Sequence, residues 1–79
     1  MNNKESYDSV FINTFEIKSN DLNDDLIYNS IDTWDSIGHM QMISEFEDLF
    51  GIEFEMDDII NFSSYNVGKD IIKKYGIDL

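Results

Sequence analysis

Residues 34 to 54 read W-D-S-I-G-H-M-Q-M-I-S-E-F-E-D-L-F-G-I-E-F, and they contain the strongest helical pattern of the chain. Apolar residues recur from Ile37 at spacings of three and four, which predicts an amphipathic helix from Ser36 to Phe50. Asp35 is a good N-cap, because its carboxylate can accept a hydrogen bond from an unpaired N–H of the first turn. Gly51 stands where a left-handed residue often ends a helix. The sequence thus predicts one dominant helix between Asp35 and Gly51.

The flanking segments predict an all-α fold. Apolar spacing indicates a first helix over residues 5–17, a short helix over 57–62 and a last helix over 67–75. Residues 18–35 keep no helical period and are rich in Ser, Asn and Asp, so we expect a long ordered loop there. We therefore expect a small four-helix bundle of three longer helices and one short helix. It should form a single domain over residues 1–79.

Composition sets limits on partners and location. Seventeen Asp and Glu face five Lys and Arg, for a net charge of −12. Such a charge repels phosphate backbones and anionic lipid, so it disfavours nucleic-acid and membrane partners and favours basic protein surfaces. The chain has no cysteine, hence no disulfide framework, and its apolar runs are too short to span a bilayer. We expect a cytoplasmic monomer.

The start of the dominant helix resembles a known family. Asp35-Ser36-Ile37 is similar to the Asp-Ser-Leu signature of acyl and peptidyl carrier proteins. Downstream, F-E-D-L-F-G-I at residues 46–52 resembles the family's Leu-Glu-Glu-x-Phe-Gly-Ile stretch. N-V-G-K-D-I at residues 66–71 is a weaker likeness to its late Thr-Val-Gly-Asp-Leu motif. The likeness covers about residues 5–75.

The resemblance implies a carrier function and no enzymatic activity. A phosphopantetheinyl transferase would attach 4′-phosphopantetheine from coenzyme A to Ser36, and the thiol of that arm would hold an acyl or aminoacyl cargo as a thioester. Asp35 would help to present the serine, while Ile37 could be a partner contact or a core residue. The other partners would be an acyl- or aminoacyl-loading ligase and thioester-processing enzymes with basic docking surfaces. Fatty acid, polyketide, non-ribosomal peptide and specialised glycan or lipid pathways all stay open.

The resemblance also implies two residue sets beside the serine. Acidic recognition would rest on Glu45, Glu47 and Asp48, expected on one exposed face, with Gln41 and Met42 as neutral contacts. Gln41 stands where many relatives have an acid. In the family a pliable core can admit an acyl chain, and the residues that could line such a pocket are Met40, Ile43, Phe46 and Phe62.

A calcium-binding helical domain is an alternative interpretation of the first loop. Asp21, Asn23, Asp25 and Asp32 fall at positions 1, 3, 5 and 12 of a possible calcium loop. Leu26 stands at the sixth position, which needs glycine, and position 12 is normally a glutamate. A polar turn region is the better interpretation, and we assign no metal ligand.

Two more alternatives concern the helix itself. His39, the only histidine, lies three residues after Ser36 and could serve as its general base in a hydrolase. No acidic residue to orient it is evident, so we expect a surface histidine. The whole chain could also be an acidic helical interaction module that docks a basic protein without any modification.

Overall fold

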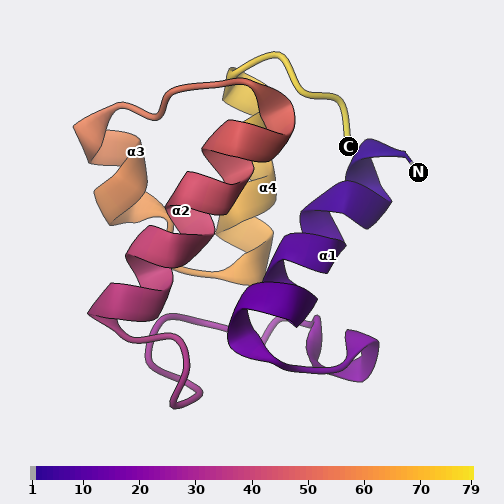
Figure 1. Cartoon of the computed structure of the whole chain (residues 1–79), viewed down its shortest axis with the longest axis vertical. Helices are drawn as coiled ribbons and strands as arrows, with labels where there is room; N and C mark the ends of the chain where they lie inside the picture. Colours follow the sequence, from indigo (N-terminus) through magenta and orange to yellow (C-terminus); the bar gives the residue numbers. More distant parts are fainter. Residues whose placement is uncertain (1) are drawn as a thin grey trace.

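The computed structural model describes residues 2–79, and within them every regular element is helical. The all-α prediction is confirmed. Figure 1 shows the four α-helices, which are α1 (Asn3–Phe15), α2 (Ser36–Phe50), α3 (Met56–Asn61) and α4 (Tyr65–Lys74). One 3-10 turn, Ser19–Asp21, interrupts the long first loop. None of the helices in residues 2–79 combines the length and the hydropathy needed to cross a membrane.

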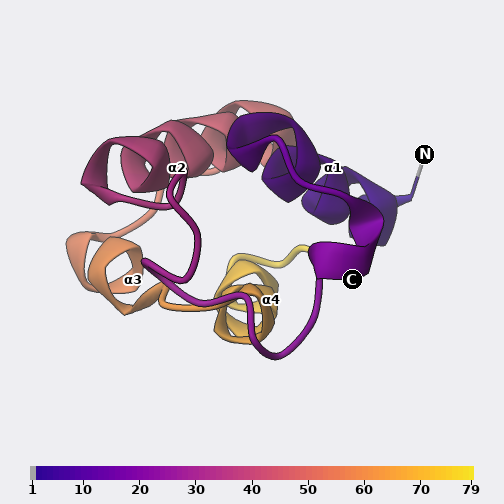
Figure 2. The ribbon, with the colours of Figure 1, turned by 90° about the horizontal axis from the view of Figure 1, so that it is seen from below.

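The helices lie in two layers. Seen from below, α1 and α2 lie side by side on one side of the molecule, and α3 and α4 lie on the other (Figure 2). α1 and α2 run in opposite directions, so the start of α2 lies near the end of α1 (Figure 1). The loop between Phe15 and Ser36 crosses the end of the bundle at which α2 begins, and Ser36 follows directly after it.

α2 begins and ends at the predicted residues. Oδ1 of Asp35 accepts a hydrogen bond from the Gly38 N–H at 2.8 Å, which satisfies one unpaired donor of the first turn. Gly51 adopts the left-handed conformation with a φ of 64°, and its N–H donates to the Glu47 carbonyl. Both ends of α2 are therefore fixed by contacts within the helix and its caps.

α1 lies two residues earlier than predicted. Its N-cap is Asn2, whose Oδ1 accepts from the Glu5 N–H at 2.8 Å. Glu16 turns left-handed with a φ of 57°, and Ile17 folds back so that its N–H donates to the Ile12 carbonyl at 3.2 Å. The apolar period predicted Ile17 as helical because this residue still packs against the core after the helix has ended.

The two later helices also differ slightly from prediction. α3 begins at Met56, and its N-cap residue Glu55 makes no side-chain cap bond. α4 begins after Ser64, whose hydroxyl accepts from the Val67 N–H at 2.9 Å. Val67, the first residue of the predicted last helix, lies inside α4 and is 39% exposed.

The core is dominated by aromatic rings. Phe11 is completely buried and lies at its centre, with ring centroids 5.2 Å from Tyr7, 5.6 Å from Trp34 and 5.8 Å from Phe46. Phe46 also stacks on Phe62 at 5.6 Å. Burying a ring of this size typically contributes a few kcal/mol, so these rings supply much of the stability of a small domain.

The long first loop is tied to the bundle at several points. Leu26 is buried, and its carbonyl accepts from the Tyr65 N–H at 2.9 Å. The Tyr28 N–H donates to the Ser63 carbonyl at 2.9 Å. Near the end of the loop, the Thr33 hydroxyl donates to the Phe15 carbonyl at 2.9 Å. These bonds hold the loop against α1 and the α3–α4 junction.

A buried acid joins α3 to the end of α4. Asp58 accepts from the Lys74 ammonium at 2.7 Å and from the Tyr75 hydroxyl at 2.6 Å. The Lys74 bond, helped by the Tyr75 bond, holds the pKa of Asp58 below its usual range. In the unfolded chain an aspartate has a pKa of about 4, and above that pH the ionised Asp58 stabilises the fold in full. This stabilisation is lost as the pH falls through the lower pKa that Asp58 has in the folded protein.

Replacing Asp58 with asparagine should therefore change how stability depends on pH. We expect Asp58→Asn to lower the thermal midpoint of unfolding at pH 7. The difference between the midpoints of variant and wild type should become smaller as the pH falls below about 4. Thermal unfolding followed by circular dichroism between pH 7 and pH 3 measures both effects. The exposed neighbour Asp57 provides the matched control Asp57→Asn. Equal behaviour of the two variants would contradict the assigned role of Asp58.

Candidate functional site

Ser36 is the first residue of α2 and its side chain is exposed. It follows directly on the N-cap Asp35, which is exposed as well. Ile37 is 70% exposed, so of its two expected roles the structure excludes the core and leaves the surface. The site is a serine hydroxyl between an acid and an aliphatic side chain, at the positive end of the dominant helix.

Gly38 explains why the loop meets α2 in this way. A Cβ at this position would overlap the carbonyl oxygen of Thr33 and lie 3.3 Å from the Phe15 ring. The backbone of the loop therefore passes α2 at a distance that only glycine allows. Because Gly38 faces inward, Ser36 and Ile37 on the other side of the first turn face solvent.

His39 connects three segments and is not the surface residue that the sequence suggested. The Trp34 indole Nε1–H donates to Nδ1 of His39 at 3.0 Å. The other ring nitrogen, Nε2, lies 2.8 Å from the Ile59 carbonyl oxygen in α3. The ring also lies nearly parallel to the Trp34 ring, at 6.3 Å between centroids. His39 thus joins the loop, α2 and α3.

The two partners fix the tautomer of His39 and remove it from catalysis. An indole N–H can only donate, so Nδ1 must accept, and a carbonyl can only accept, so Nε2 must carry the proton. Both ring nitrogens are then engaged away from Ser36. The structure therefore argues against His39 as the general base of a hydrolase.

Replacing His39 with phenylalanine should destabilise the protein without touching Ser36. His39→Phe leaves the Trp34 N–H and the Ile59 carbonyl without partners, which typically costs about 2 kcal/mol when the groups are buried. Chemical denaturation measures the free energy of unfolding. His39→Gln, which keeps a donor and an acceptor, should recover part of the loss. Wild-type stability in His39→Phe would show that these bonds contribute nothing.

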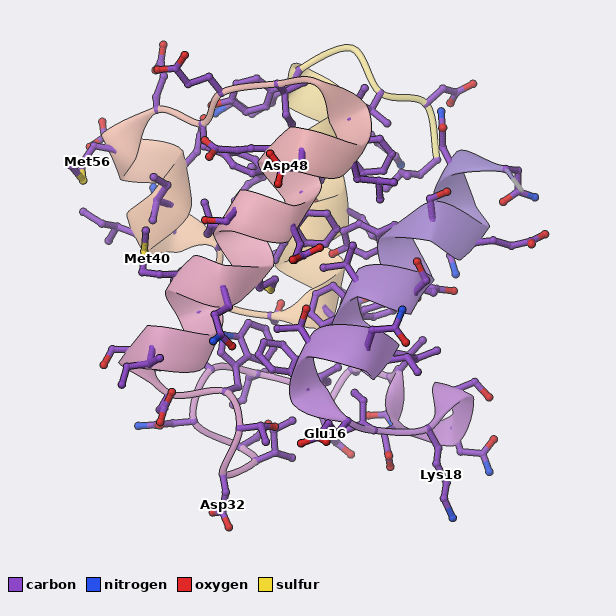
Figure 3. All side chains as sticks on the ribbon, viewed as in Figure 1. Glu16, Lys18, Asp32, Met40, Asp48 and Met56 are labelled. Atoms are coloured by element: carbon purple, nitrogen blue, oxygen red, sulfur yellow. The ribbon has the colours of Figure 1, made fainter. Side chains whose placement is uncertain are left out.

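The expected docking residues do not share one face. Gln41, Glu45 and Asp48 are exposed. Glu47 is half-buried, its Oε2 accepts from the Phe54 N–H at 2.9 Å, and it lies about 160° around the helix from Glu45. Figure 3 shows Asp48 on the front of α2. The exposed acidic surface of α2 is therefore formed by Glu45 and Asp48.

Met42 was expected as a neutral docking contact, and this expectation is wrong. Its side chain is completely buried in the core. Residue 42 follows Gly38 by four positions, so both lie on the inward side of α2.

Of the four residues expected to line an acyl pocket, three lie in the core and one lies at the surface. Ile43, Phe46 and Phe62 are buried, as that pocket would require. Met40 is 49% exposed and lies at the edge of the molecule near Met56 (Figure 3), so it does not line the core with the other three.

An open groove of about 890 Å³ runs between α1 and α2 and includes Ser36. We call it the α1–α2 groove. Its lining mixes hydroxyl, amide and aliphatic side chains with a single carboxylate, from Ser9, Val10, Asn13, Thr14, Ser36, Ile37, Met40, Gln41, Ser44, Glu45 and Leu49.

Sequence reasoning missed the exposed apolar residues of α3. Met56 and Ile60 are each 70% exposed and lie one helical turn apart. Ile37 and Met40 of α2 are exposed as well, and we call these four exposed apolar residues the α2–α3 patch; in the view of Figure 3, Met40 and Met56 lie toward the same edge. The sequence carried a signal, because Met56 and Ile60, four residues apart, share one side of α3, while Ile59 lies about 100° around the helix from Ile60.

Two of the four candidate calcium ligands in the first loop accept hydrogen bonds from nearby backbone N–H groups. Oδ2 of Asp21 accepts from the Lys18 N–H at 3.1 Å, and Oδ1 of Asn23 accepts from the Asp25 N–H at 2.9 Å. Within residues 2–79, no three His, Cys, Asp or Glu side chains are grouped as metal ligands would be. This arrangement favours the polar-turn interpretation of the loop over the calcium alternative.

Comparison of the chain with protein-family models, with curated proteins and with solved structures found no match. The proposal for its function therefore depends on the sequence motif and on the geometry of the site.

Proposed function

We propose that this protein is an acyl carrier protein, which carries an acyl or aminoacyl intermediate on a 4′-phosphopantetheine arm attached to Ser36. The observation that carries the proposal is the exposed Ser36 hydroxyl at the first position of α2, within the Asp-Ser-Ile motif. A transferase can modify only a serine that enters its active site, and an exposed first-turn residue meets that condition.

The modification would proceed by phosphoryl transfer from coenzyme A. The Ser36 oxygen forms a bond to the phosphorus that carries pantetheine, and the bond from that phosphorus to the bridging oxygen of the pyrophosphate breaks. The adenosine bisphosphate part of coenzyme A leaves, and the serine proton passes to a base of the transferase. The resulting phosphodiester would lie at the positive end of α2, which favours a negative charge.

Thioester formation would follow on the arm. The arm ends in a thiol, and the chain itself has no cysteine, so this thiol would be the only one on the loaded protein. A ligase would load the cargo there, and thioester-processing enzymes would take it off. The protein would carry the substrate and would catalyse neither step.

The charge of the site suits basic partners. Residues 36–61 contain no lysine or arginine, and Glu45 and Asp48 are exposed on α2. The α2–α3 patch adds exposed apolar side chains on α2 and α3. A partner with a basic rim around an apolar centre would complement both features.

An unmodified interaction module is the second candidate, because the α2–α3 patch could dock a partner without any arm. Modification separates the two. We expect the protein, incubated with coenzyme A and a broad-specificity phosphopantetheinyl transferase, to gain the mass of one arm, as measured by intact mass spectrometry. A folded protein that gains no arm would overturn the carrier proposal and leave the interaction module.

A further inference from the structure

The core offers little room for a long acyl chain. Phe46 and Phe62 are completely buried and stack on each other at 5.6 Å, and Phe46 also stacks on Tyr7 at 5.1 Å. A chain that entered between α2 and the other helices would have to part these rings. Opening a well-packed core loses contacts that the rings make with one another.

The α1–α2 groove begins at Ser36 and offers a different surface. Asn13 on α1 and Gln41 on α2 provide amides, and Thr14 and Ser44 provide hydroxyls. These groups can both donate and accept hydrogen bonds, as the amides and the hydroxyl of a pantetheine arm require. Glu45 is the only charged residue of the lining, so the groove would favour a cation there.

The groove also fits the length of the arm. Ser36 and Glu45 are nine residues apart on one helix, which places them roughly 14 Å apart along its axis and about half a turn apart around it. The arm has about thirteen bonds between phosphorus and sulfur, comparable to four residues of extended chain, or roughly 15 Å. An extended arm that crosses the outward side of α2 past Ile37 and Gln41, which line the same groove, can therefore bring an aminoacyl nitrogen, a few atoms beyond the sulfur, near Glu45.

We propose that the arm lies in the α1–α2 groove and that the cargo is a short, polar aminoacyl group whose ammonium faces Glu45. This inference rests on the carrier function proposed above. It assigns the cargo to the surface between α1 and α2, and it assigns no acyl chain to the aromatic core.

The test compares two cargoes in three proteins. The transferase installs the loaded arm directly from alanyl-coenzyme A or octanoyl-coenzyme A, and intact mass spectrometry follows hydrolysis of each thioester. Gln41→Trp fills the groove, and Asn61→Trp places the same side chain on an exposed position of α3 as the control. We expect the alanyl thioester carried by Gln41→Trp to be hydrolysed about fivefold faster than the one carried by the wild type. This is the factor that corresponds to the free energy of one ordinary hydrogen bond. Asn61→Trp should match the wild type, and octanoyl hydrolysis should be equal in all three proteins.

A second measurement needs no variant. In nuclear magnetic resonance spectra of the wild type, alanyl loading should shift the amide signals of residues 9–14 and 41–45, and octanoyl loading should leave the ring signals of Phe46 and Phe62 in place. Shifts of those rings, or equal alanyl hydrolysis in the wild type and Gln41→Trp, would overturn the groove proposal. Failure of the wild type to accept any arm would instead overturn the carrier function, so the two failures are distinct.

Discussion

Gly38→Ala is expected to destabilise the protein by roughly 3 kcal/mol or more, at the upper end of the range for overpacking. The added methyl group would overlap the Thr33 carbonyl, which is backbone and cannot rotate away. Thr33 is itself held by its hydrogen bond to the Phe15 carbonyl. Relief would require the loop to separate from α2, which disturbs the position of Ser36.

Chemical denaturation of Gly38→Ala and Gly51→Ala separates this overlap from the general effect of losing a glycine. A Cβ at Gly51 meets no atom within 4 Å, but its φ of 64° disfavours alanine by about 1 kcal/mol. Gly38→Ala should therefore lose clearly more stability than Gly51→Ala. A smaller loss in Gly38→Ala would mean that the loop yields easily and that the close approach does not fix the serine.

Ser36→Ala is expected to abolish modification completely while leaving the fold intact. The side chain is exposed, so its removal should change the free energy of unfolding by no more than about 0.5 kcal/mol. Ser44→Ala removes another exposed serine of the same helix and should keep full modification. Intact mass spectrometry after incubation with coenzyme A and the transferase compares the two variants.

Circular dichroism of both serine variants verifies that each one is folded. An arm still attached to folded Ser36→Ala would place the modification elsewhere and refute the assignment of Ser36. Loss of modification in both variants would indicate that the transferase recognises the surface of α2 as a whole, and that the Ser36 hydroxyl alone does not decide modification.

The sequence predicted α2 correctly because its signals are local. The Asp35 carboxylate and the left-handed Gly51 act within a few residues of the helix ends, and the apolar stripe lies between them. The predicted C-terminal end of α1 was two residues too late because Glu16 adopts a left-handed conformation that few residues other than glycine and asparagine favour. Such a turn depends on the packing of Ile17, which only the fold supplies.

The environment of individual side chains was harder to predict. His39 takes its partners from Trp34 and from Ile59 twenty residues away, and no local pattern encodes the second contact. Met40 and Met42 were exchanged in role, because a wide apolar stripe does not show where its centre lies. By contrast, the exposed position of Ser36 could be predicted from Asp35 as the N-cap, because a cap is encoded by a few neighbouring residues.

The only tryptophan in the chain supplies an optical probe of the serine-bearing region. Trp34 is fully buried, its indole N–H is bonded to His39, and it lies two residues before Ser36. Its emission wavelength and quenching therefore respond to any opening of the joint between loop and α2. Fluorescence from one native residue can thus follow, without a label, whether a partner enzyme loosens that joint when it takes hold of the serine.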